Sequence, residues 1–441
     1  MKKHIILTII ALCIFTACTV FNVSEETEVQ ENMLNNSTTT NNGTSESSAE
    51  NPVSSRFSIE AEPLTAEEEA VFVSAIADLT VGLFKRSFAE KSDENTLVSP
   101  LSVLLALAMT ANGAEGTTLE EMETVLGRGI ALADLNQLLA SYVSNLPSED
   151  GSRLNIANSI WLYDDEGFVV QDDFLKINTE FYAAEIRNAP FNQDTVDEIN
   201  DWVSRMTDEM ITEILDEISP NSVMHLINAI AFDSAWEEPY KEHQVRKRDF
   251  TAFDGSVTET DFLHSTEYTY IETSNATGFL KSYIGGHYSF AALLPNENVR
   301  IEDFISDMTS ESLMSALNSA HMYYDGVITQ IPKFTFEYDL EMNGVLTTMG
   351  MPTAFSPSEA DFSRLGSSAR GNIFINRVLH KTFIEVDEHG TRAAAVTAVE
   401  MNDESEPEYK YVFLDRPFVF AIIDNATNLP VFVGALMEIP K

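Results

Sequence analysis

The feature that most constrains this chain is a segment near the C-terminus with the residue pattern of two strands joined by a glycine. Residues 380–387 alternate apolar and polar side chains, which is the two-residue period of a half-buried strand. Gly390 then permits a bend. Residues 391–399 are small or β-branched with one charge, Arg392, whereas surface loops are normally richer in proline, asparagine, aspartate and glycine. The pattern indicates a strand that lies outside a sheet.

If this run entered a sheet, its side chains would divide between two faces with a period of two. One face would carry uncharged residues, the first four of them small, as burial requires: Thr391, Ala393, Ala395, Thr397, Val399 and Met401. The other face would carry Arg392, Ala394, Val396, Glu400 and Asn402. The only charges before Asp403 therefore point outward.

Length and composition favour one large domain. The chain has 441 residues, 44% of them hydrophobic and 10% aromatic, which suffices for a substantial core. Residues 59–441 contain no long linker and no internal repeat, so we expect a single domain there. The net charge of −44 argues against a nucleic-acid partner, whose phosphates would be repelled, and indicates a solvated acidic surface.

The N-terminus has the pattern of an export signal. Residues 1–17 begin with lysines and continue as a short apolar run, too short for a confident membrane span. The run ends at Cys18 in a sequence that resembles a bacterial lipoprotein box, except that Phe15 replaces the usual leucine. We expect lipidation of Cys18, with ordinary signal cleavage as the alternative. Cys13 and Cys18 are the only cysteines, so the mature chain has no internal disulfide.

Residues 18–58 are rich in Ser, Thr, Asn and Glu. They offer too little apolar surface to offset the entropy of ordering. We expect a disordered tether that separates the domain from a membrane, with a recognition segment as the less favoured interpretation.

Local patterns predict several elements of the domain. Thr65 and Glu68 form a capping box before a first helix, and Ser99-Pro100 begins a second helix that is apolar nearly all round. Further helices are predicted at 171–182 and 196–215. Strands are predicted at 154–163, 183–190, 223–232, 278–284, 288–294, 327–335, 372–378 and 411–423.

Catalytic and metal-binding motifs are missing from the sequence. It has no Gly-x-Ser-x-Gly elbow, no His-Glu-x-x-His, no paired Cys-x-x-Cys and no Walker loop. We therefore expect no enzymatic activity, no metal and no cofactor.

The run from Glu388 to Thr397 resembles the reactive-centre hinge of inhibitory serpins. Other matching segments are Asn95 to Ser102, Gly116-Thr117-Thr118, Asp233 to Trp236, Ile331 to Phe334 and Arg416 to Phe420. The resemblance covers residues 61–441. It implies an α+β serpin fold with mixed sheets, about eight to nine helices and an exposed reactive-centre loop at about 388–410.

The resemblance also implies roles for individual residues. The hinge would comprise Glu388, Gly390, Thr391, Ala393, Ala394, Ala395 and Thr397. A buried polar cluster behind the central sheet, called the shutter, would comprise Ser99, Ser102, Asn228 and His380, which can satisfy one another while two strands part. Trp236 would mark the top of the sheet where insertion begins, although an ordinary core tryptophan explains it equally well.

The implied function is inhibition of a serine protease by a suicide-substrate mechanism. Counting from Gly390 predicts the scissile bond at Glu404-Ser405, whereas counting back from Pro417 gives Glu406-Pro407, which proline would protect. A glutamyl-specific protease is favoured, and an elastase-like or chymotrypsin-like protease that uses Val399 or Met401 is the rival. A merely soluble acidic loop, a cysteine-protease target and a non-inhibitory serpin-fold surface or binding lipoprotein remain open.

The same resemblance, with the N-terminal pattern, predicts where the protein acts. We expect a monomer that is exported to the bacterial cell envelope or the extracellular space. Its partners would be serine proteases, bound as a covalent acyl complex, and a membrane reached through the lipid anchor.

Overall fold

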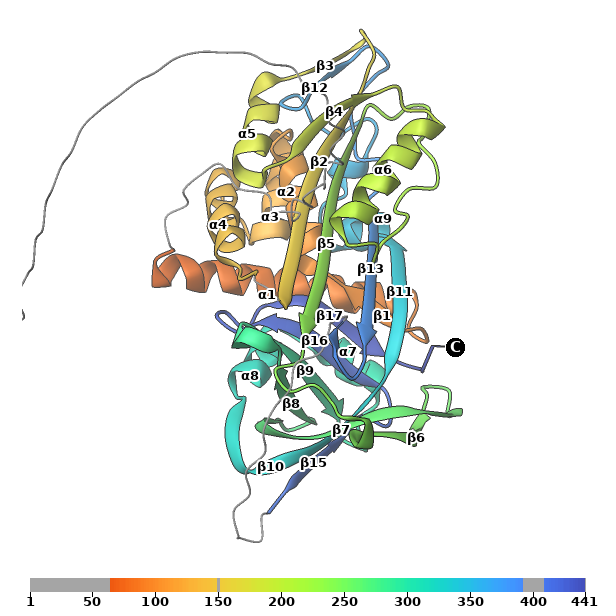
Figure 1. Ribbon diagram of the computed structural model, residues 1–441. Coiled ribbons are helices and arrows are strands. Elements are labelled where there is room, and N and C mark those ends of the chain that lie inside the picture. The colour runs from red at the N-terminus through yellow and green to blue at the C-terminus, as the bar shows by residue number, and fades with distance from the viewer. Residues whose placement is uncertain (1–63, 149–150, 392–407, 441) are drawn as a thin grey trace, which may run out of the picture. The chain divides into compact units, whose positions relative to one another are not determined.

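The computed structural model describes residues 64–148, 151–391 and 408–440 (Figure 1). Its helices are α1 (Ala66–Glu90), α2 (Pro100–Ala111), α3 (Gly116–Gly127), α4 (Leu132–Asn145), α5 (Asp172–Tyr182), α6 (Gln193–Met206), α7 (Ile301–Asp307), α8 (Ser310–Asn318) and α9 (Asn343–Met349). None of the helices in these ranges is long and apolar enough to cross a bilayer.

The strands belong to two large sheets and two small ones. The first nine are β1 (Thr96–Val98), β2 (Ser152–Tyr163), β3 (Phe168–Val170), β4 (Glu185–Ala189), β5 (Met224–Ala235), β6 (Val245–Thr251), β7 (Val257–Glu272), β8 (Ala276–Ser282) and β9 (Tyr288–Pro295). The others are β10 (His321–Pro332), β11 (Phe334–Glu341), β12 (Gly366–Ser368), β13 (Leu379–Val386), β14 (Gly390–Thr391), β15 (Lys410–Phe413), β16 (Phe418–Asp424) and β17 (Pro430–Leu436).

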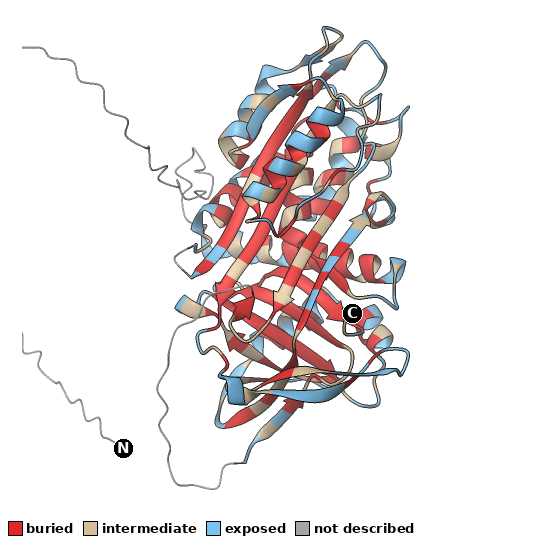
Figure 2. Ribbon diagram, turned by 45° about the vertical axis from the view of Figure 1, so that its right-hand side comes forward, coloured by how far each residue is buried: buried red, intermediate tan, exposed pale blue. Residues whose placement is uncertain are grey.

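The sheet that carries the functional segment has the order β14-β5-β2-β4, and β11 and β13 form a separate pair. The other large sheet has the order β1-β17-β16-β9-β8-β7-β10-β15, with β6 attached to β7. Both faces of β2 and β5 are covered, which explains why their residues are buried along most of their length (Figure 2). The continuous apolar run at 223–232 predicted this strand correctly.

Helices α2 and α6 cover opposite faces of β5. Ile227 and Ala229 pack into the core beneath α6, while the alternate residues Leu226 and Ile230 pack into the main core, which also contains α2. Helix α2 is buried nearly all round, as its composition predicted. The capping box at the start of α1 is also confirmed: Thr65 Oγ1 accepts from the Glu68 amide, and Glu68 Oε2 accepts from the Thr65 amide.

The prediction of a helix over 196–215 is wrong in its second half. Helix α6 ends at Met206 because Asp208 and Glu209 adopt positive φ angles of 49° and 63°. The chain then returns along the helix, and the side-chain oxygen of Asn200 accepts from the amides of Ile214 and Leu215. The apolar residues that extended the helical pattern are buried from a loop instead.

The predicted strand at 372–378 is also wrong, because the strand begins only at Leu379. The backbone of the earlier segment is bonded to helical residues outside any sheet. The Ile375 amide donates to the Ala354 carbonyl at 2.9 Å, and the Val378 amide donates to Asn343 Oδ1 at 2.8 Å. The predicted strand at 411–423 is two strands, β15 and β16, separated by residues 414–417.

Candidate functional site: the hinge, the shutter and the groove between them

The chain reverses direction between β13 and β14 in a tight turn. The Asp387 amide donates to the Gly390 carbonyl at 3.1 Å. Asp387 Oδ1 accepts from the amides of His389 and Gly390 at 2.8 and 3.1 Å. The bend therefore lies at Glu388 and His389, whereas Gly390, where the sequence suggested it, is already part of a strand.

Strand β14 is docked on the C-terminal end of β5. Gly390 lies opposite Ala235 and Thr391 opposite Ser234, in an antiparallel pair. The Trp236 amide donates to the His389 carbonyl at 2.9 Å. The first two residues of the strand-like run have therefore joined the central sheet.

Trp236 lies directly against this turn. Its ring is 1% exposed and stacks on Tyr283, with centroids 4.6 Å apart and an angle of 12°. The indole Nε1 donates to the Asp387 carbonyl at 2.8 Å. Tyr283 in turn makes a hydroxyl hydrogen bond with Thr391, which is 3% exposed. Thr391 thus lies on the inner face of the sheet, and a larger or charged residue would have no room there.

Two lysines near the turn were not singled out by sequence reasoning. Lys281 is buried beside Trp236 and Tyr240 and donates to Glu267 Oε1 at 2.9 Å. Burial works against its charge, but the combined attraction of Glu267, Tyr240 and Glu238 outweighs that effect and the pKa of Lys281 is raised. Lys333 forms a half-exposed ion pair with Glu388. The spacing along the chain does not predict that Lys281 pairs with Glu267 or that Lys333 pairs with Glu388.

The expected shutter divides into two hydrogen-bonded groups. In the first, the Ser99 amide donates to His380 Nε2 at 3.1 Å, and Ser99 Oγ accepts from the Ser102 amide at 3.3 Å. Burial lowers the pKa of His380 to about 4. The imidazole is therefore neutral at pH 7, with its proton on Nδ1 because Nε2 is the acceptor.

In the second group, Asn228 pairs with a residue that the sequence did not suggest. Asn228 Nδ2 donates to Asn158 Oδ1 at 2.8 Å, and Asn158 Nδ2 donates to the Tyr182 carbonyl at 2.8 Å. Asn228 Oδ1 is buried without a partner. The only signal for Asn158 was a short amide within the apolar strand pattern at 154–163.

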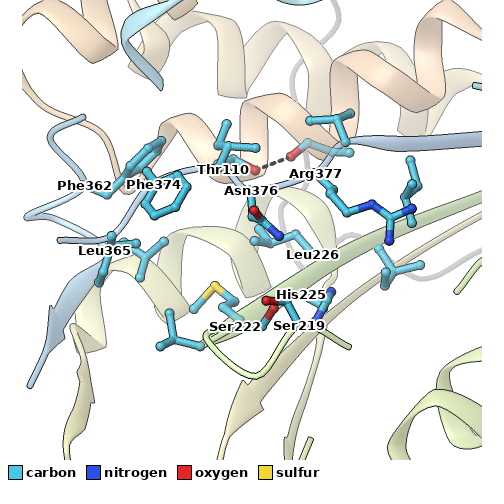
Figure 3. Close-up of a pocket in the computed structure, with 18 of the residues that line it drawn as sticks. Thr110, Ser219, Ser222, His225, Leu226, Phe362, Leu365, Phe374, Asn376 and Arg377 are labelled. Carbon is cyan, nitrogen blue, oxygen red and sulfur yellow. Dashed lines mark hydrogen bonds between the residues drawn. The ribbon is translucent and has the colours of Figure 1, made fainter. Parts of the chain in front are cut away.

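The two groups face a common cavity. No strand ladder joins β5 to β13 in the part of the chain that the structure describes. Between these strands lies a pocket of about 710 Å³ (Figure 3). Its lining includes Ser102 from α2, Asn228 from β5 and His380 from β13. The sheet is thus bridged by β14 at one end and open beside the shutter.

Other expected site residues lie outside the described residues. These are Cys18, Ala393, Ala394, Ala395, Thr397, Glu404 and Ser405. Within the described ranges, no three His, Cys, Asp or Glu side chains gather as metal ligands.

Comparison with known proteins agrees with this geometry. Residues 74–439 match the serpin (serine protease inhibitor) family. An uncharacterized serpin-like protein of Thermococcus kodakarensis is 32% identical, over 85% of this chain and 87% of its own length. Human neuroserpin is 28% identical, over 82% and 91%.

Solved structures give the same result. The thermophilic serpin tengpin in its native state superposes with a TM-score of 0.80 and 45% identity, covering 86% of this chain and 96% of tengpin. Tengpin in the latent state gives a TM-score of 0.77 and 43% identity, covering 86% and 100%. Members of this family are in general inhibitors of serine or cysteine proteases. The chain belongs to the serpin family.

Proposed function

We propose that this serpin inhibits serine proteases as a suicide substrate, through cleavage of the loop between β14 and β15 and its insertion beside β5. The observation that carries the proposal is the half-built strand β14. Gly390 and Thr391 already pair with β5, and the pocket beside Asn228 and His380 leaves room for the strand to continue.

The register supports the same step. If the pairing of Thr391 with Ser234 continues, Thr397 comes opposite Asn228, whose Oδ1 has no partner. The turn at Asp387 sets the register against β13 and brings Thr397 opposite His380. The hydroxyl of Thr397 would then lie beside the shutter, where Asn228 Oδ1 has no hydrogen-bond partner. A buried polar atom without a partner is costly, so the new bond would favour insertion.

The chemistry follows from ordinary acyl transfer. The protease serine would attack the carbonyl carbon of Glu404, and the bond to Ser405 would break with proton transfer to the leaving amine. The freed segment would then add two hydrogen-bonded ladders, about ten or more bonds at roughly 1 kcal/mol net each. Insertion would carry the ester-linked protease away before water can release it, so the complex would be covalent.

The loop composition supports a glutamyl-specific target. Glu404 is the favoured residue before the bond, and no Lys or Arg occurs between Val396 and Tyr409. An elastase-like or chymotrypsin-like protease acting at Val399 or Met401 is the rival. Complex formation with glutamyl endopeptidase, followed by sequencing of the released C-terminal fragment from Ser405, would distinguish them.

We further propose that the protein is exported from a bacterial cell as a monomer and held at the envelope by lipid on Cys18, with residues 18–58 as a tether. The support is the sequence pattern of residues 1–17. More than one acyl chain gives firm anchoring, so a Cys18→Ser variant should leave the membrane fraction.

The decisive experiment incubates the protein with glutamyl endopeptidase, elastase and trypsin. A detergent-stable band at the mass of the protease plus residues up to Glu404 is expected with at least one of them. If every protease cleaves the loop and turns over freely, the protein is a non-inhibitory serpin. Such relatives of the fold exist: thyroxine-binding globulin in complex with thyroxine superposes with a TM-score of 0.73 at 24% identity.

A further inference from the structure

Two polar side chains at the far end of the pocket have unused hydrogen-bonding capacity. His225 on β5 and Arg377, just before β13, lie on opposite sides of it (Figure 3). His225 Nε2 is buried without a partner. Arg377 bonds Glu341 through Nε at 3.1 Å and Asp216 through Nη1 at 3.4 Å, and Nη2 takes part in neither bond.

Two independent registers point to the same loop residue. On one side, the pairing of Thr391 with Ser234 continues along β5 until Glu400 is opposite His225. On the other side, the bond between Asp387 and Gly390 fixes the register against β13, and its continuation brings Ala398 opposite Leu379, the first residue of that strand. Arg377 lies two residues before Leu379, and Glu400 two residues after Ala398, so Glu400 comes to the side of the groove that carries Arg377. Glu400 lies outside the described residues, but His225 and Arg377, on the two sides of the groove, are both described.

The faces agree as well. Thr391 is on the inner face of the sheet, so Glu400 falls on the outer face. His225 is on that face, since its ring contacts Phe191, a residue packed against the α6 core, at a centroid distance of 5.1 Å. By the same registers, Ala398 comes opposite Ile227 and Leu379, which both pack into the α6 core.

We propose that His225 and Arg377 form a carboxylate-binding position that receives Glu400 when the loop inserts, an inference that rests on the proposed function. A carboxylate accepts hydrogen bonds only, and both of these side chains offer N–H donors. Burial holds His225 neutral, with a pKa lowered to about 4, so it donates as a neutral imidazole from Nε2. Arg377 supplies the charge, and such charge-assisted bonds are the stronger kind.

Nearby acidic groups make the position selective for an inserted strand. Asp216 and Glu341 already hold Arg377 at its exposed side, with 70% and 48% exposure of their side chains. A free carboxylate in solvent would meet the repulsion of both acidic groups on the exposed side of Arg377. A carboxylate on a hydrogen-bonded strand is delivered to the buried side, where the unpartnered His225 Nε2 lies.

The test uses loop-cleaved protein. Because glutamyl endopeptidase would also cut after Glu400, all variants carry Glu404→Arg, and Arg392→Gln removes the other tryptic site of the loop. Trypsin then opens the chain before Ser405, which the mass of the 405–441 fragment verifies. Guanidinium unfolding is measured for intact and cleaved protein. Glu400→Gln is compared with Glu406→Gln, a matched control that remains on the released fragment and outside the inserted register.

Cleaved Glu400→Gln protein should unfold at a midpoint about 0.2 M lower than the cleaved parent, whereas the intact forms should not differ. Glu406→Gln should change the unfolding midpoint of neither the cleaved nor the intact protein. In cleaved protein, Arg377→Gln and Glu400→Gln should be non-additive, and in intact protein they should add. Equal midpoints for cleaved Glu400→Gln and its parent would overturn the carboxylate position. If the cleaved parent itself gains no stability, loop insertion fails, which is the distinct failure of the proposed function.

Discussion

The two ends of the groove beside β5 differ in whether the sheet is closed. At the hinge end, Trp236 donates to the Asp387 carbonyl, the Thr391 hydroxyl bonds Tyr283, and β14 closes the sheet. His389 Nδ1, in the turn, is buried without a partner. At the far end, Asn228 Oδ1 and His225 Nε2 are buried without partners beside an open pocket. A strand ladder that is formed at one end and, in the described part of the chain, missing beside the open pocket favours strand addition from the hinge toward the shutter.

The largest effect is expected at the closed end. Thr391→Arg would place a charge on the inner face of the sheet, where Thr391 is 3% exposed and bonded to Tyr283. Burying an unpaired charge costs far more than one strand bond returns. The variant should change from inhibitor to substrate, with almost no covalent protease complex on a denaturing gel. Thr335→Arg, at an exposed position of β11, is the control and should trap protease normally.

An unchanged complex yield for Thr391→Arg would contradict insertion that begins at β14. It would also remove the difference between the two ends of the groove, because the hinge end could then accommodate a buried charge.

The second prediction concerns His380 beside the open pocket. Its folded pKa of about 4 lies below the unfolded value of about 6.5, so the unfolded chain binds a proton first as pH falls. The contribution of His380 to stability is complete above pH 6.5 and is lost between about pH 6.5 and 4, by roughly 3 kcal/mol.

The measurement is the free energy of unfolding at several pH values for the parent and for His380→Gln, whose amide oxygen can still accept from Ser99. The parent should lose stability more steeply than the variant within this window. Parallel curves would mean that His380 is not held neutral, and the shutter would then be more polar than its burial indicates.

Sequence reasoning was accurate where the determinant is local. The two-residue period at 380–387, the capping box of α1 and the buried run of β5 all have structural counterparts. It failed where the backbone finds distant partners. Residues 372–378 have a strand-like composition, but the side chain of Asn343 and the carbonyl of Ala354 bind their backbone amides, and neither is visible in the segment itself.

The candidate site shows the same limit. The family resemblance identified Ser99, Asn228 and His380 as shutter residues. It did not identify Asn158, which only the cross-strand register of β2 and β5 places opposite Asn228. Hydrogen-bond partners across a sheet depend on register, and register is set by the whole core rather than by any one strand.

The third prediction tests that asparagine pair. Asn158→Ala would leave Asn228 Nδ2 unpaired in addition to its already unpaired Oδ1, at a cost of about 1–3 kcal/mol in unfolding free energy. Asn221→Ala, at an exposed position, is the control and should be neutral. The loss should be smaller in loop-cleaved protein, where Thr397 would supply a new partner. An equal loss in both forms would argue that the shutter gains nothing from insertion.

The smallest effect is expected for the ion pair that holds the turn. Lys333 and Glu388 have side chains about 31% and 30% exposed, and exposed pairs contribute roughly 0.2–1 kcal/mol. Lys333→Gln should therefore lower the unfolding free energy of the intact protein by less than Asn158→Ala does.

Lys381→Gln, which removes a comparable pair with Glu337 across the β11–β13 ladder, is the matched control. Both pairs are partly exposed, but of the two lysines only Lys333 restrains Glu388. Only its loss should therefore raise the fraction of loop cleaved per protease trapped. If both variants trap protease equally well, the turn is held by Trp236 and the Asp387 bonds without help from the ion pair.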